Sequence, residues 1–98
     1  MLRITLVSRD PVEEVYALEG WIVDEETRLL ADTCGGVVAR GARLVLDLGG
    51  VRFIDDGGLV VLSGWAGPKL RLRRASDLVA QLLAGYGMGC EPTEARSE

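Results

Sequence analysis

The chain has 98 residues, of which 48% are hydrophobic and 27% are charged, a composition typical of one globular domain with a modest core. Eleven basic and fifteen acidic residues give a formal net charge of -4, so the chain has no basic field that would attract nucleic acid or anionic lipid. It contains no histidine, which removes the usual general base near neutral pH and the commonest zinc ligand. We therefore expect neither an enzyme nor a nucleic-acid-binding protein, and we expect no cofactor and no metal site.

The cysteines and the first residues of the chain indicate the cellular compartment of the protein. Cys34 and Cys90 are far apart and form no Cys-x-x-Cys pair, which favours a reducing environment over a disulfide framework. Residues 1–8 lack the long apolar stretch of a signal peptide. Nowhere does the chain approach the run of roughly 18 apolar residues that is needed to cross a bilayer. The sequence therefore predicts a cytoplasmic protein that does not insert into membranes.

Two stretches near the start of the chain predict strands. Residues 4–7 and 15–23 are rich in β-branched and apolar side chains, as strands are. Asp10-Pro11 lies between them and suits a turn. We expect an antiparallel hairpin to open the domain.

The segment after the hairpin predicts a helix over residues 25–40. Asp24 stands at the N-cap position, and Gly41 offers the left-handed residue that often ends a helix. Four apolar residues fall at helical spacing on one side. They are Leu30, Cys34, Val37 and Val38.

The middle of the chain predicts a central strand followed by a second helix. Residues 44–48 form a nearly continuous apolar run, as an interior strand does. After the apolar residues 51–54, the acidic pair Asp55-Asp56 precedes two glycines and a further apolar run. An acidic pair followed by glycines suits a helix entrance, so we expect the second helix to begin near Gly57.

A strand and a third helix are expected next. Residues 69–74 alternate leucines with cations, which predicts a strand with one solvated face. Ser76 is a good N-cap for the helix, and Gly85 or Gly87 ends it. The expected apolar stripe of this helix comprises Leu78, Val79, Leu82, Leu83 and Tyr86.

This order of elements predicts the α/β class. A single domain with the order β-β-α-β-α-β-α would form a mixed sheet of four to five strands flanked by helices. We expect the domain to span residues 1–88. A polar tail without apolar periodicity, expected to be disordered, would follow over residues 89–98.

One segment carries a motif. Residues 46–59 read Leu-Asp-Leu-Gly-Gly-Val-Arg-Phe-Ile-Asp-Asp-Gly-Gly-Leu. This segment resembles the signature of STAS domains, the family of bacterial anti-sigma factor antagonists, in which an apolar strand leads through Asp-Leu-Ser to Phe-Ile-Asp-Ser-Ser-Gly-Leu. The resemblance covers about residues 4 to 86, and it implies a STAS-like fold for the chain.

The resemblance assigns roles by position. Asp55 matches the motif aspartate, Asp56 matches the serine that a kinase phosphorylates in partner-switching members, and Gly57 matches the second serine. Gly58 and Leu59 match the closing Gly-Leu. Because the acceptor hydroxyl is missing here, phosphorylation at this position cannot switch the protein. Either Asp56 partly imitates the phosphorylated state, or the chain belongs to a branch that does not switch.

The resemblance implies a binding module rather than an enzyme. It would dock on an ATP-binding, kinase-like anti-sigma factor through residues 55–59 and the helix that follows. Alternatively, the chain would be the soluble STAS subunit of a membrane transport complex of the phospholipid ABC type, where it would brace the ATPase subunit without needing a phosphoacceptor. A nucleotide or small-molecule sensor is a third interpretation, but the chain has no phosphate-cradling motif. Independently of the family, Asp55 or Asp56 can cap the helix, a role worth ~1 kcal/mol that is compatible with docking.

A magnesium site is disfavoured. Asp47, Asp55 and Asp56, with Lys69 as a cationic partner, would have to converge across the loop that separates them. The acidic pair that such a site uses after the first strand is also missing.

The remaining candidates have structural interpretations. The basic cluster in residues 69–74 predicts a solvated sheet edge, where long cations discourage aggregation. Trp21 and Trp65 are expected to pack in or against the core, and either one, if exposed, would be a candidate hot spot for a protein interface. Cys34 lies on an apolar stripe and is expected to be an inert core residue.

Overall fold

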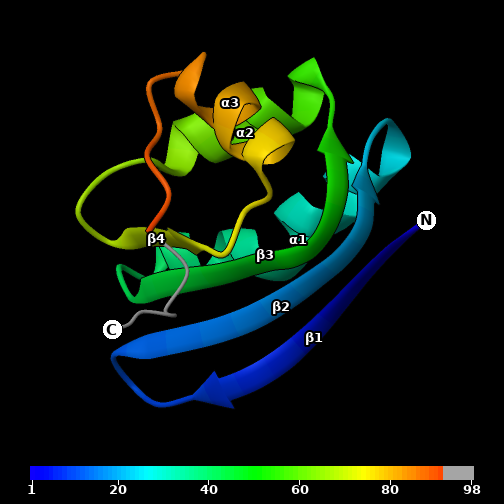
Figure 1. Ribbon diagram of the computed structural model, residues 1–98. Coiled ribbons are helices and arrows are strands. Elements are labelled where there is room, and N and C mark those ends of the chain that lie inside the picture. Colours follow the sequence, from blue (N-terminus) through cyan, green and yellow to red (C-terminus); the bar gives the residue numbers. More distant parts are fainter. Residues whose placement is uncertain (92–98) are drawn as a thin grey trace, which may run out of the picture.

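The computed structural model describes residues 1–91. Its elements are β1 (Leu2–Arg9), β2 (Glu13–Ile22), α1 (Glu25–Ala39), β3 (Arg43–Ile54), α2 (Asp56–Trp65), β4 (Leu70–Arg73) and α3 (Asp77–Ala84). They form one mixed four-stranded sheet with three helices (Figure 1). The α/β class and the order β-β-α-β-α-β-α are therefore confirmed.

The strands lie in sequence order across the sheet. β1 pairs antiparallel with β2, whereas β2, β3 and β4 are parallel to one another. The predicted hairpin is confirmed. Its turn is held by the Asp10 carboxylate, which accepts hydrogen bonds from the amides of Val12 and Glu13, each at 2.8 Å. The Asp10 amide also donates to the Glu13 carbonyl at 2.9 Å, so the side chain and the backbone of Asp10 both stabilise the turn.

The helices cover one side of the sheet (Figure 1). Alternate residues of β2, among them Leu18 and Ile22, point toward the helices and are fully buried. Leu30, Cys34 and the other buried residues of the helices complete a single core. Cys34 is fully buried in this core, as expected, and burial raises the pKa of its thiol to about 12.

β3 is longer than expected. It runs without a break from Arg43 through Gly49 and Gly50 to Ile54, instead of ending near residue 48. A Cβ atom at Gly50 would lie 2.7 Å from Cγ of Glu19, and one at Gly49 would lie 2.5 Å from the Arg74 guanidinium. The two glycines therefore allow neighbouring side chains to lie across the strand.

The start of α3 and the end of α1 agree with the prediction, whereas the start of α1 does not. The Ser76 hydroxyl accepts a hydrogen bond from the Val79 amide at 3.2 Å, and Gly41 follows α1 with φ of 80°. Asp24 occupies the N-cap position of α1, but its side chain makes no capping hydrogen bond and its φ is 49°. The prediction of a side-chain cap at Asp24 is therefore wrong.

The third helix buries less than expected. Val79 and Leu83 are fully buried, but Leu78 is 51% exposed and Tyr86, which lies beyond the helix, is 39% exposed. Beyond it, the Glu91 amide donates to the Leu72 carbonyl at 2.7 Å, so the chain as far as residue 91 lies beside β4. Most of the expected tail, residues 92–98, lies outside the described residues.

One carboxylate lies inside the described part of the protein. Glu14, on β2, is 3% exposed and accepts hydrogen bonds from the Tyr16 hydroxyl at 2.6 Å and the Arg40 guanidinium at 2.7 Å. Arg9 on β1 approaches the same carboxylate to 3.3 Å. The Tyr16 and Arg40 hydrogen bonds lower the pKa of Glu14, so the group is charged near neutral pH. It ties β1, β2 and the end of α1 together.

Candidate functional site

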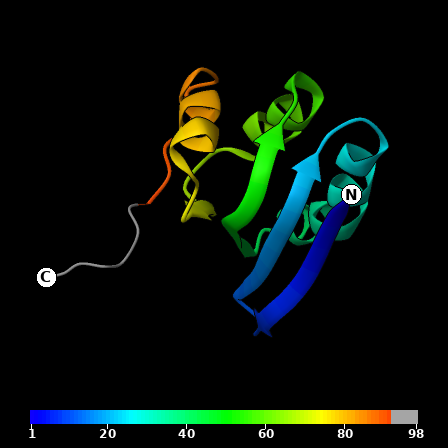
Figure 2. The ribbon, with the colours of Figure 1, turned by 45° about the vertical axis from the view of Figure 1, so that its right-hand side comes forward.

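The expected site lies where β2 and β3 end. Figure 2 shows the arrowheads of these two parallel strands at the same end of the sheet, where the chain turns into α1 and α2. The Asp55 amide donates to the Ile22 carbonyl at 3.0 Å, and the Asp24 amide donates to Oδ2 of Asp55 at 3.0 Å. These bonds join the two strand ends, so the starts of α1 and α2 are held side by side.

Asp55 is the cap of α2. Its Oδ1 accepts a hydrogen bond from the Gly58 amide at 2.9 Å, while Oδ2 accepts from Asp24. The amides of Asp24 and Gly58, in that order of strength, hold the pKa of Asp55 below its ordinary value. Both oxygens of Asp55 are therefore used inside the protein.

Asp56 and Gly57 form the exposed part of the expected site. Asp56 opens the helix, and its Oδ1 accepts a hydrogen bond from the Tyr86 hydroxyl at 3.4 Å. A Cβ atom at Gly57 would have Oδ1 of Asp55, at 3.5 Å, as its nearest contact. This part of the helix entrance presents a carboxylate and bare backbone to the outside.

Gly58 and Leu59 are buried instead. A Cβ atom at Gly58 would lie 2.8 Å from Cγ2 of Ile54 and 2.9 Å from Cγ2 of Ile22. Leu59 is 2% exposed and belongs to the core. Of the five expected contact residues, these two hold α2 against β2 and β3 rather than lie on the surface.

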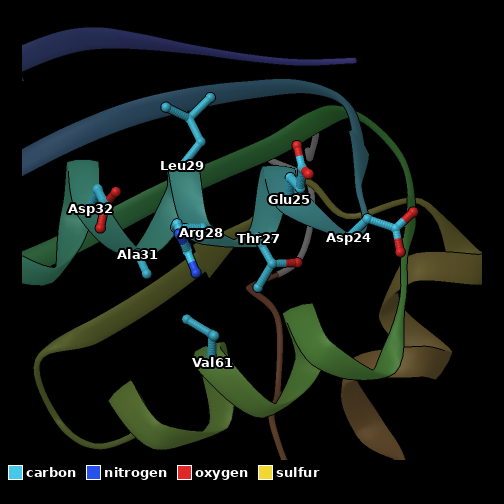
Figure 3. Close-up of a pocket in the computed structure, with 8 residues that line it drawn as sticks. All are labelled: Asp24, Glu25, Thr27, Arg28, Leu29, Ala31, Asp32 and Val61. Atoms are coloured by element: carbon cyan, nitrogen blue, oxygen red, sulfur yellow. The ribbon is translucent and has the colours of Figure 1, made fainter.

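An open groove of about 970 Å³ lies between α1 and α2 (Figure 3). Its residues are Asp24, Glu25, Thr27, Arg28, Leu29, Ala31, Asp32 and Val61. Its lining includes three carboxylates and one cation, and the Thr27 hydroxyl is buried without a hydrogen-bond partner among residues 1–91. We call it the α1–α2 groove. Periodicity in the sequence does not indicate this groove, because the groove depends on how two helices separated by β3 pack.

The other sequence candidates lie apart from this site. Asp47 binds Arg74, with Oδ1 3.0 Å from Nε. Within the described residues, no three potential ligands gather as a metal site would require. Arg71 and Arg73 pair with Glu91 at 2.7 and 3.3 Å. The basic cluster is thus an ion-paired, solvated sheet edge, as expected.

The two tryptophans differ. Trp65 packs against the core while remaining partly exposed, as expected. Trp21 is 46% exposed and pairs in register with Phe53, which is 38% exposed. The expectation that Trp21 packs in or against the core is wrong because Gly20 and Ile22 set the alternation of β2, which turns Trp21 to the side that no helix covers.

Comparison with known proteins bears on this arrangement. The family model described as "Mlab, STAS domain" matches residues 5–90. Among solved structures, the chain is similar to the anti-sigma factor antagonist SpoIIAA in its unphosphorylated form, with a TM-score of 0.69 and 16% sequence identity over 96% of this chain and 90% of that one. A structure of Mglu is also similar, with a TM-score of 0.49 and 19% identity over 90% of this chain and 19% of that one. No curated protein matches the sequence.

These findings agree with the geometry. At this level of identity the likeness to SpoIIAA shows a shared fold, and the family match spans nearly the whole described chain. No helix within residues 1–91 combines the length and the apolar character needed to span a membrane. The order of elements, the mixed sheet and the match over residues 5–90 lead to one conclusion: the chain belongs to the STAS domain family.

Proposed function

We propose that the chain is a protein-interaction module of the anti-sigma factor antagonist type. It binds an ATP-binding, kinase-like anti-sigma factor through the helix entrance within residues 55–59, where Asp56 and Gly57 are exposed, and through the rest of α2. The main support for this proposal is the helix entrance at the end of β3. There the Asp55 carboxylate caps α2, while Asp56 and Gly57 are exposed. A capped helix start with one exposed carboxylate is suited to docking.

Asp56 is the phosphoacceptor-equivalent residue in this proposal. No hydroxyl side chain is present in residues 55–59, so a serine kinase has nothing to modify there. A phosphate group would bring about -1.5 to -2 charges and three acceptor oxygens, whereas a carboxylate brings one charge and two oxygens. The partner therefore meets one fixed charge state, and binding at this position is not switched by phosphorylation.

Further support comes from the relatives. SpoIIAA, which has the same fold, is named an anti-sigma factor antagonist and was solved in an unphosphorylated form. The proposed role is binding rather than catalysis. It places the chain in the cytoplasm, where a kinase-like partner has access to ATP.

The test measures binding to a defined partner. Each kinase-like anti-sigma factor of the source genome is purified and titrated with the chain by calorimetry, in ADP and in ATP. Binding by one of them supports the proposal, and the Asp56→Ser variant is then expected to bind more tightly and to lose that gain once phosphorylated. Glu19→Ser, which changes an exposed carboxylate of β2 outside α2 and its entrance, is the matched control. Absence of binding to every such factor would refute the proposal.

A second candidate is favoured by the same fixed carboxylate. A soluble STAS subunit of a phospholipid ABC-type transport complex would brace the ATPase subunit and would need no phosphoacceptor, which agrees with Asp56. Co-expression with the ATPase subunits of the source genome separates the two candidates. Stoichiometric co-purification with one ATPase subunit, without affinity for any anti-sigma factor, would support the transport role.

A further inference from the structure

The two edges of the sheet differ. β4 forms one edge and has only four residues, and the chain after α3 lies beside it, because the Glu91 amide donates to the Leu72 carbonyl at 2.7 Å. β1 forms the other edge (Figure 1). It has eight residues and, within residues 1–91, pairs only with β2. One edge is therefore short and partly covered, whereas the other is long and open.

The open edge lacks most of the features that keep edge strands from pairing. Natural proteins protect such edges with lysine, proline, charged side chains, bulges or short strands. Residues 2–9 contain neither lysine nor proline, and residues 4–8 are uncharged. An irregularity in the pairing with β2 lies between Leu6 and Ser8, which leaves residues 2–6 as a regular strand. Leu6, at the end of this regular part, is 42% exposed.

The hydrogen bonds to β2 determine which backbone groups of β1 point outward. The Trp21 amide donates to the Met1 carbonyl at 3.1 Å, so Met1 is a residue whose backbone bonds to β2. In an antiparallel pair, such residues alternate with residues whose N–H and C=O groups point away. The outward-pointing residues are therefore Leu2, Ile4 and Leu6, which we call the free edge. Their side chains lie on the side of the helices, because Leu2 belongs to the core and Ile4 packs against it.

The free edge is complementary to itself in one register. When two copies of β1 run antiparallel with Ile4 opposite Ile4, each Leu2 lies opposite a Leu6 of the other copy. Every residue of one free edge then faces a residue of the other, and each opposed pair exchanges two backbone hydrogen bonds. A shift by two residues in either direction leaves a free-edge residue of each copy without such a partner. Apolar side chains also meet across the new pair, as in stable antiparallel sheets.

The same register keeps like charges apart. On the side of the sheet without helices, Arg3 lies opposite Thr5 of the second copy, while Glu19 lies in register on the other flank of Arg3. Arg9 lies beyond the paired residues, and its Nε is 3.3 Å from the carboxylate of Glu14. Like charges opposite one another would oppose the pairing. Here no two charged side chains of β1 face each other directly.

We propose that two copies of this chain pair through the free edge of β1. The two β1 strands run antiparallel about a two-fold axis at Ile4, and the two sheets join into one continuous sheet. The contact uses the same surface on both copies and therefore closes at the dimer. It gives hydrogen-bond partners to the outward backbone groups and covers the exposed Leu6. This inference does not depend on the proposed function, because it uses none of residues 55–59.

Sedimentation velocity of the full chain tests the association. The wild-type chain should pass from monomer to dimer as its concentration rises, and it should not grow further. Leu6→Pro should lose the dimer, because the Leu6 N–H points away from β2 and proline there removes a hydrogen bond of the dimer alone. Val12→Ser, which changes an apolar side chain that is 63% exposed before β2, should associate like the wild type. Circular dichroism checks folding, and Leu6→Lys replaces Leu6→Pro if the proline variant does not fold.

Cysteine crosslinking tests the register. In the Cys90→Ser background, a chain with Arg3→Cys is mixed with a chain with Thr5→Cys under mild oxidation, and mass spectrometry detects the products. Their Cα atoms would lie about 4.5 Å apart across the new pair, a separation that a disulfide can bridge. The mixture should therefore yield a linked heterodimer in excess of either homodimer. Arg3→Cys mixed with Ser8→Cys is the out-of-register control and should link much less.

Each of the following results would overturn the proposal. The wild-type chain could stay monomeric at all concentrations. Dimers could persist in the folded Leu6→Pro or Leu6→Lys variant, or be lost in Val12→Ser. Arg3→Cys could link to Ser8→Cys as readily as to Thr5→Cys, which would show that the two chains do not pair in this register.

Discussion

The neighbouring carboxylates Asp55 and Asp56 at the start of α2 have different roles. Asp55 places one oxygen on the Gly58 amide and the other on the Asp24 amide. Asp56, one residue later, lies within the helix and contacts only the Tyr86 hydroxyl at 3.4 Å. The sequence predicts that one of the two caps the helix. Which of the two does so depends on the residue at which α2 begins. That residue is fixed by the packing of Leu59 and Leu62 in the core.

Replacing Asp55 therefore costs more stability than replacing Asp56. Asp55→Ala leaves the Gly58 and Asp24 amides without their acceptor, and we expect it to lower the free energy of unfolding by about 1 kcal/mol or more, as lost N-caps do. Asp56→Ala should change it by less than about 0.5 kcal/mol, as exposed substitutions generally do. Urea denaturation monitored by circular dichroism measures both. Equal losses in the two variants would contradict the assignment of Asp55 as the cap.

At the scale of the element, α2 approaches the sheet because of one glycine. Gly58 faces the side chains of Ile22 and Ile54 so closely that no Cβ atom fits. Gly64, near the other end of the same helix, has no atom within 4 Å of the position a Cβ would take. Two glycines of one helix thus have opposite roles. One is needed for packing, and the other only weakens the helix.

Alanine at these two positions should change stability in opposite directions. Gly64→Ala should stabilise the protein by roughly 0.5–1 kcal/mol, because alanine is the better helix former. Gly58→Ala gains the same propensity but forces apart two β-branched side chains, and overpacking of this kind costs about 1–3 kcal/mol. Thermal and urea unfolding of both variants measure the signs. Stabilisation by Gly58→Ala would show that α2 does not pack as closely as described.

Whether a segment forms a helix or a strand could be predicted from local patterns. The length of β3 and the side of the sheet on which Trp21 lies could not. The hairpin, the Ser76 cap and the glycine end of α1 follow from turn and capping chemistry that a few residues carry. At Gly49 within β3, the Arg74 guanidinium from a distant part of the chain lies where a Cβ atom would stand, and no local pattern predicts that contact. The exposure of Trp21 likewise depends on which face the helices cover, and periodicity alone does not determine that.

At the scale of the whole molecule, the buried Glu14 joins parts of the chain that local patterns do not connect. Tyr16 lies two residues along β2, Arg9 belongs to β1, and Arg40 follows α1. Glutamate in a strand is ordinarily solvated, so nothing in the local sequence indicates burial. Hydrogen bonds from Tyr16 and Arg40 and an ion pair with Arg9 compensate for the burial of this charge. The stability of the hairpin against α1 should therefore respond to pH.

The sign of that response follows from the lowered pKa of Glu14. Its folded-state pKa lies below the ordinary value of 4.5, so its contribution to stability is complete above that pH. It is lost as the pH falls through the folded-state pKa. Glu14→Gln should therefore lower the urea midpoint at pH 7, and the difference from the wild type should shrink as the pH falls below 4.5 and the wild-type carboxylate is protonated. Glu19→Gln, an exposed residue of the same strand, should show no such pH-dependent difference. A Glu14→Gln deficit that stays constant from pH 7 to pH 3 would mean that lost packing, rather than the charge of the Glu14 network, explains the destabilisation.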